Sequence, residues 1–81
     1  MKESELKSIV ASEIVNLRKS KGYTASELAL KASIAASTLS RYENGYGSID
    51  LAIIEKIVSA CNQEIYIFFS KCIAKLQQNN L

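Results

Sequence analysis

The chain has 81 residues, of which 48% are hydrophobic and 22% are charged, and its net charge is +2. This length and composition fit one small globular domain over residues 1–81. Because it contains two cysteines and no histidine, we expect no metal site, no cofactor and no enzymatic activity. The charged start at 1–5 excludes a signal peptide and the longest apolar run, 65–69, is too short to cross a bilayer, so we expect a cytoplasmic protein without membrane contact.

The first predicted helix covers about residues 4–21. Leu6, Val10, Ile14 and Leu17 recur at steps of three and four residues and form one apolar stripe. Gly22 is a typical helix terminator and predicts where this helix ends.

Two short helices are predicted next. Thr24 is a good N-cap and Glu27 follows three residues later, which is the pattern of a capping box; this helix ends near residues 31–32. The following helix covers about residues 36–43, with Leu39 and Tyr42 on its inner face, and is closed by residues 44–45.

The fourth predicted helix begins after Asp50, a plausible N-cap, and extends to about residue 60. Its apolar stripe consists of Leu51, Ile54, Ile57 and Val58. We expect all four side chains to face the core.

The last segment, residues 64–77, fits two structures. Residues 65–69 have high β propensity, which allows a short strand paired with its copy in a second subunit. The apolar positions from Ile65 to Leu76 also fit a helical stripe, and we favour the helix.

So small a domain has little room to bury every apolar side chain of this segment. We therefore expect residues 64–78 to form a dimerisation segment, although Phe68 and Phe69 also fit a monomer core. Cys61 and Cys72 are expected to be buried thiols. The residues assigned to the dimer interface are Ile65, Phe68, Phe69 and Cys72.

Residues 25–44 have the pattern of a helix-turn-helix, in which two short helices are joined by a turn of three to four residues. Ala29 is small enough to let the two helices pack closely. The outer face of the second helix is small, polar and basic, which suits entry into the DNA major groove; its residues are Ala36, Ser37, Thr38, Ser40 and Arg41.

Several motifs over residues 14–69 together resemble the Cro/cI (XRE) family of helix-turn-helix regulators. They are Leu17-Arg18, Gly22-Tyr23-Thr24, Glu27-Leu28-Ala29, Ser37-Thr38-Leu39-Ser40-Arg41 and Glu43-Asn44-Gly45. The small size and the apolar residues 67–69 look most like controller proteins of restriction–modification systems, although compact phage repressors share these features.

The resemblance implies an all-α, five-helix, lambda-repressor-like domain. It also implies a homodimer that binds pseudo-palindromic operator DNA and regulates its own gene and an endonuclease gene. The sequence leaves open whether two dimers pair into a tetramer on adjacent sites, and whether the protein contacts RNA polymerase as an activator would.

Carried over by position, the resemblance assigns roles to individual residues. Arg18 and Glu43 match a salt bridge that joins the first helix to the recognition helix. The base edges are assigned to Ala36, Ser37, Thr38 and Arg41. The phosphates are assigned to Thr24, Ser26, Ser40, Asn44 and Tyr46.

The chain departs from the family pattern in three places. Ala25 stands where glutamine is frequent, Ser33 stands where the turn usually has glycine, and Ala35 and Ala36 replace a cap and a polar or basic residue. These departures leave Arg41 as the strongest direct reader, so specificity depends more on thymine methyl groups and on DNA shape.

A different class of function also fits. The net charge is modest and the recognition face is mostly neutral, which allows a protein-interaction module such as an antitoxin or antirepressor. A partner that co-purifies in stoichiometric amount would favour that alternative.

Overall fold

The computed structural model describes the backbone of residues 3–79 and the side chains of residues 5–78. Within these residues the chain forms five α-helices and no strand: α1 (Glu3–Ser20), α2 (Ala25–Ala32), α3 (Ala36–Asn44), α4 (Leu51–Ala60) and α5 (Ile65–Asn79). The predicted all-α, five-helix fold is confirmed. None of these helices is long and apolar enough to cross a membrane.

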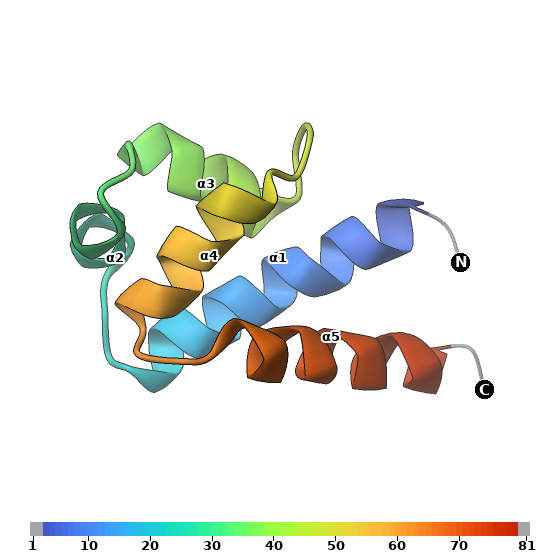
Figure 1. Cartoon of the computed structure of the whole chain (residues 1–81). Coiled ribbons are helices and arrows are strands. Elements are labelled where there is room, and N and C mark those ends of the chain that lie inside the picture. The colour runs from blue at the N-terminus through green and yellow to red at the C-terminus, as the bar shows by residue number, and fades with distance from the viewer. Residues whose placement is uncertain (1–2, 80–81) are drawn as a thin grey trace.

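Helix α1 packs against both α5 and α3, and α2 packs against both α3 and α4. In Figure 1, α1 and α5 lie side by side and run in opposite directions. The start of α1 and the end of α5 are therefore at the same end of the molecule, far from α2.

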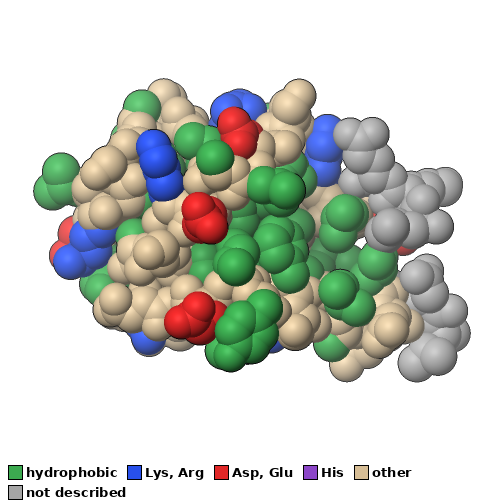
Figure 2. All heavy atoms as spheres, in the orientation of Figure 1, with side chains coloured by type: hydrophobic (Ala, Val, Ile, Leu, Met, Phe, Trp, Pro, Cys, Tyr) green, Lys and Arg blue, Asp and Glu red, His purple; other side chains and the backbone are tan. Residues whose placement is uncertain are grey.

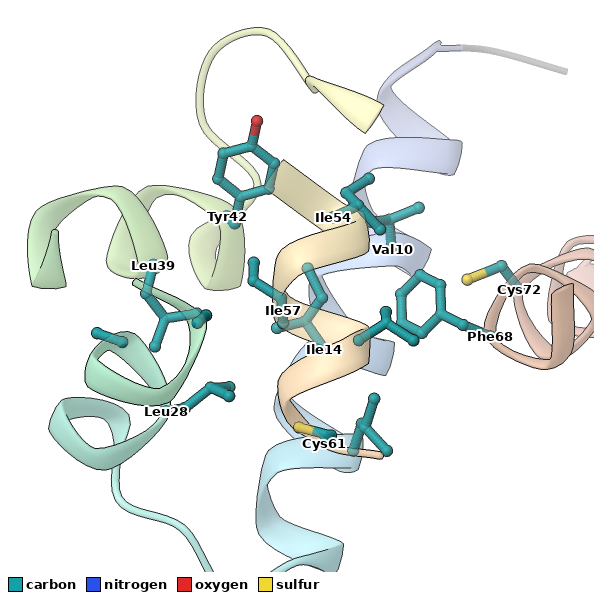
Figure 3. Packing of buried hydrophobic residues seen from close by; sticks show 14 of the residues in the cluster. Val10, Ile14, Leu28, Leu39, Tyr42, Ile54, Ile57, Cys61, Phe68 and Cys72 are labelled. Atoms are coloured by element: carbon teal, nitrogen blue, oxygen red, sulfur yellow. The ribbon is translucent and has the colours of Figure 1, made fainter. Parts of the chain in front are cut away.

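One hydrophobic core joins all five helices, as Figure 3 shows. Each predicted stripe contributes to it, and the fully buried side chains include Ile14, Leu28, Leu39, Ile57 and Phe68. Leu51 is an exception. Its stripe predicts a place in the core, but it lies in the first turn of α4 with 67% of its surface exposed.

The segment 65–69 is helical, so the favoured helix is confirmed and the strand alternative is wrong. The helix turns Phe68 and Cys72 to the same face, where the Phe68 ring points from α5 toward α1 and α4 (Figure 3). The helix buries this pair against the rest of the core, so packing overrides the local β propensity of residues 65–69.

The assignment of Phe68 and Cys72 to a dimer interface is corrected by this packing. Each is only 1% exposed within the single chain, so neither side chain has surface left to offer a second subunit. Burial, together with the nearby Glu13 carboxylate, raises the pKa of the Cys72 thiol to about 11. Burial also raises the pKa of Cys61, and both residues are buried free thiols, as predicted.

An ion pair between Glu13 of α1 and Lys75 of α5 adds to this packing. The Glu13 side chain is almost fully buried, whereas Lys75 is partly exposed. The lysine thus neutralises a carboxylate that would otherwise be costly to bury. No sequence pattern indicates this pair, because its two residues are far apart in the chain.

The turn between α2 and α3 adopts a left-handed conformation at Ser33, where no glycine is present. Ser33 takes the left-handed conformation with φ of 57°, and its N–H and that of Ile34 bond to the carbonyls of Leu30 and Ala29. This is a Schellman ending, in which a residue with a Cβ atom is strained.

We expect Ser33→Gly to raise the free energy of unfolding by about 0.5–1 kcal/mol, because glycine adopts this φ without a steric cost. Thermal unfolding followed by circular dichroism measures the effect as a rise in Tm of a few degrees. Ser33→Ala is the control, because it keeps the Cβ atom and should give no gain. A lower Tm for Ser33→Gly would contradict this explanation of the turn.

Candidate nucleic-acid interface

The start of α2 is fixed by a complete capping box. The backbone N–H of Glu27 donates to the Thr24 hydroxyl at 3.1 Å, and the N–H of Thr24 donates to the Glu27 carboxylate at 2.8 Å. The pKa of Glu27 is lowered, mainly because its carboxylate accepts this hydrogen bond from the Thr24 backbone N–H. The local sequence therefore sets where α2 begins, and Thr24 and Ser26 are exposed there.

α3 begins without such a cap. Its N-cap residue, Ala35, makes no side-chain hydrogen bond, as expected from the replacement of a capping residue by alanine. The N–H groups of the first turn of α3 therefore have no side-chain acceptor from the N-cap, and a helix N-terminus of this kind favours a negatively charged group.

The outward face of α3 carries the residues predicted to meet bases. Ala36, Ser37 and Arg41 are exposed and Thr38 is partly buried, whereas Leu39 and Tyr42 on the opposite face are buried in the core. The structure thus brings the four predicted base-contacting residues together on one helix.

The predicted phosphate contacts lie around this face. Thr24, Ser26, Ser40, Asn44 and Tyr46 are all exposed, two of them at the start of α2 and three at or beyond the second half of α3. The amide of Asn44 donates to the Ser40 carbonyl at 2.8 Å and lies 3.4 Å from the Ser40 hydroxyl. These hydrogen bonds orient the Asn44 side chain along the end of α3.

Arg18 and Glu43 join α1 to α3, as predicted. Two contacts link the guanidinium and the carboxylate: Nε to Oε2 at 2.7 Å and Nη2 to Oε1 at 3.3 Å. Nη1 also donates to the Tyr23 carbonyl at 3.0 Å. The two side chains are only 15% and 12% exposed, so this bidentate pair fixes α3 in its position with little screening by water.

Arg41 makes contacts that the sequence did not indicate. Its Nη1 donates to the carbonyl of Ser48 at 3.2 Å, and its guanidinium carbon lies 5.1 Å from the centre of the Tyr42 ring. Gly47 lies beneath the same guanidinium. Only the pattern Gly45-Tyr46-Gly47 hinted at an unusual loop here, and that pattern does not indicate a contact with Arg41.

A second surface is apolar, contains no residue of α3 and is bordered by residues 48–49 of the α3–α4 loop. Figure 2 shows hydrophobic side chains gathered on the face where α1, α4 and α5 meet, and this face is hollowed into a groove. Leu51 and Ile73 are 67% and 53% exposed. We name this feature the apolar groove; its lining includes Leu6, Val10, Leu51, Phe69, Ile73 and Leu76.

The described residues contain no group of three side chains suited to hold a metal ion. The arrangement on α3 offers hydrogen-bond donors and acceptors, one guanidinium and methyl groups. These groups are suited to hydrogen bonding and van der Waals contact with a ligand surface.

Comparison with known proteins gives one family and several structural relatives. The family model described as Helix-turn-helix, HTH_3, matches residues 14–68, which is more than half of the chain. A search of the curated protein sequences finds no match.

Among the solved structures, two variants of the restriction-modification controller protein C.Esp1396I superpose closely. One has 28% sequence identity and a TM-score of 0.82, and the other 26% and 0.85; in both cases 91% of this chain and 99% of the controller are covered. The clp gene regulator ClgR from Corynebacterium glutamicum shares the fold at 17% identity, with a TM-score of 0.83 over 93% of this chain and 80% of ClgR. These matches confirm the resemblance predicted from the motifs.

Proposed function

Because the chain belongs to the helix-turn-helix family, we propose that it is a homodimeric transcriptional regulator that binds pseudo-palindromic operator DNA. Residues 1–81 act as one domain, with DNA read by residues 25–44 and dimerisation through the segment 64–78. The similarity to restriction-modification controllers supports the control of such genes, its own included, in the cytoplasm.

The exposed face of α3 carries this proposal. Small uncharged side chains surround a single guanidinium there, which allows the helix to approach base edges closely while Arg41 donates to two acceptors of one guanine. Ala36, Ser37 and Thr38 complete the base contacts through methyl and hydroxyl groups. The bidentate Arg18–Glu43 pair supports α3 from behind.

Residues on both sides of α3 bind the DNA backbone in this proposal. They position the helix and give no sequence information. Because these contacts displace counterions from phosphates, affinity should fall steeply with salt. The residues are Thr24, Ser26, Ser40, Asn44 and Tyr46.

The test is a mobility-shift titration against the DNA upstream of the protein's own gene, with excess random competitor, at two salt concentrations. Discrete bands that survive the competitor support operator binding, and a second band indicates two dimers on adjoining sites. No shift at low salt, or a smear that the competitor removes, contradicts the proposal and favours a protein-interaction module. Transcription assays with RNA polymerase then separate activation from repression.

We assign the dimer contact to the apolar groove. Of the residues predicted for the interface, Phe69 and Cys72 line this groove, Cys72 at its buried floor, and Ile65 is partly buried elsewhere on α5. The groove is lined by α1, α4, α5 and residues 48–49 of the α3–α4 loop, and no residue of α3 belongs to its lining, so a second copy seated there leaves the predicted base-contacting side chains uncovered. The two half-sites should then be about 34 Å apart.

We expect Ile73→Glu to convert the dimer to a monomer and to weaken operator binding by about tenfold or more, because it places a charge in the apolar groove. Sedimentation equilibrium measures the mass and a mobility shift measures the affinity. Tyr66→Glu is the matched control, because Tyr66 is an exposed aromatic residue on the same helix but outside the groove lining. An intact Ile73→Glu dimer would rule out this interface.

We expect Arg41→Ala to cost roughly 1–3 kcal/mol of operator binding and to relax the preference at one base-pair position. Titration against operators with single base-pair changes measures both effects. Lys56→Ala, on the exposed side of α4, is the control and should leave the preference unchanged. An equal loss on every sequence would instead identify Arg41 as a phosphate contact.

A further inference from the structure

The loop between α3 and α4, residues 45–50, holds the Arg41 side chain together with the neighbouring ring of α3. The Ser48 carbonyl accepts a hydrogen bond from Nη1 at 3.2 Å, and the Tyr42 ring lies 5.1 Å from the guanidinium carbon. An exposed arginine usually samples many rotamers. Here these contacts favour one position, at the edge of the α3 face that carries Ser37.

Gly47 provides the space for that position. A Cβ atom added to Gly47 would lie 3.1 Å from Nη1 and 3.5 Å from Cδ of Arg41, and apart from the two adjacent residues no other described residue has an atom within 4 Å. Its φ of +72° is in the left-handed region that favours glycine. A Cβ atom at residue 47 would therefore force the Arg41 guanidinium to shift by a few tenths of an ångström from this position.

The loop that carries Gly47 is itself fixed by hydrogen bonds. The N–H of Tyr46 donates to the Arg41 carbonyl at 3.0 Å, and the N–H of Asp50 donates to the hydroxyl of buried Tyr42 at 2.8 Å. Asp50 also caps α4 through the N–H of Ala52. The surface beneath Arg41 is therefore anchored to both α3 and α4.

We propose that Gly47 is a positioning residue that preorganises Arg41 for reading the operator. Only Nη1 is hydrogen-bonded among the described residues, so the edge formed by Nε and Nη2 remains available for two acceptors on a base. Holding the side chain before binding reduces the entropy lost on DNA contact. The inference rests on the proposed function, because it gives a role to Gly47 within the same interface.

The chain offers a matched control at Gly22. Gly22 has nearly the same φ, +73°, but a Cβ atom added there would meet no described atom within 4 Å. Gly22→Ala and Gly47→Ala therefore impose a similar backbone strain, and only the second one meets Arg41. A difference between them in DNA binding reports on the arginine and not on the strain.

The experiment titrates the full-length chain and both variants against the operator and its single base-pair variants. We expect Gly47→Ala to bind about tenfold more weakly and to lose preference at the position that Arg41→Ala affects. Gly22→Ala should keep the affinity and the preference. Equal behaviour of the two glycine variants at equal Tm would overturn the inference.

A double variant and a DNA-free measurement complete the test. In the Arg41→Ala background, Gly47→Ala should cause no further loss of preference, because the residue that it displaces is gone; an additive loss would overturn the inference. Without DNA, the guanidinium N–H signals of Arg41 in NMR spectra should broaden in Gly47→Ala and stay sharp in Gly22→Ala. Sharp signals in both variants would also overturn the inference. If the unaltered protein binds no operator, that result contradicts the proposed function and not the role of Gly47.

Discussion

Phe68→Ala is expected to lower the free energy of unfolding by about 4 kcal/mol, because it removes a large buried ring and leaves a cavity. The ring is 1% exposed, points from α5 toward α1 and α4 (Figure 3) and meets the Phe69 ring edge-on at a centroid distance of 5.5 Å. A loss of this size is a large fraction of the stability of a small domain. It would detach α5 from the rest of the fold.

Urea unfolding at one fixed protein concentration measures this effect, because dimerisation makes apparent stability depend on concentration. Phe68→Leu is the control, since it keeps most of the apolar volume and should cost about 1.5 kcal/mol or less. A loss below about 1 kcal/mol for Phe68→Ala would mean that the ring is not in the core. It would then favour a place for Phe68 in a subunit interface.

Glu43→Gln is expected to cost about 3 kcal/mol, because it leaves the Arg18 guanidinium largely buried without a counter-charge. The pair is bidentate and its side chains are 15% and 12% exposed, so water replaces the lost carboxylate poorly. Since the pair joins α1 to the recognition helix, specific DNA binding should weaken together with stability.

Thermal unfolding and operator titration of the same samples measure the two effects. Glu55→Gln removes an exposed carboxylate from α4 and should change the free energy of unfolding by less than about 0.5 kcal/mol. The double variant Arg18→Met with Glu43→Leu should recover most of the stability, because it removes both charges. A Glu43→Gln protein as stable as the Glu55→Gln protein would show that the pair contributes nothing.

The sequence determined the helices wherever the signal is local. The capping box of Thr24 and Glu27, the N-cap Asp50 and the terminator Gly22 set helix ends through hydrogen bonds to neighbouring residues, and such bonds can be read from spacing alone. The apolar stripes likewise identified most of the core, because the helical period places every third or fourth residue on one face.

The pairing of Arg18 with Glu43 was also predicted from the sequence, although for a different reason. The two residues are 25 positions apart, and no local rule joins them. The pair was predicted only because the motifs around it resemble a known family. Neither residue of the Glu13–Lys75 pair lies in one of these motifs, so the sequence did not predict that pair.

Only the tertiary structure decided between helix and strand for residues 65–69, because β propensity is weaker than the gain from burying Phe68 and Cys72 against α1 and α4. It also placed these two side chains in the core and not in the expected interface. Leu51, predicted for the core, lies in the apolar groove. A stripe identifies which residues share a face, but the neighbouring helices determine how far along the helix that face is covered.

The same distinction applies to Arg41. Its place on the outer face of α3 follows from helical periodicity and could be predicted from the sequence. Its contacts with Gly47 and Ser48 depend on the path of a loop that is held by the Tyr42 hydroxyl and Asp50. Those contacts join residues through space, so they exist only once α3 and α4 have packed together.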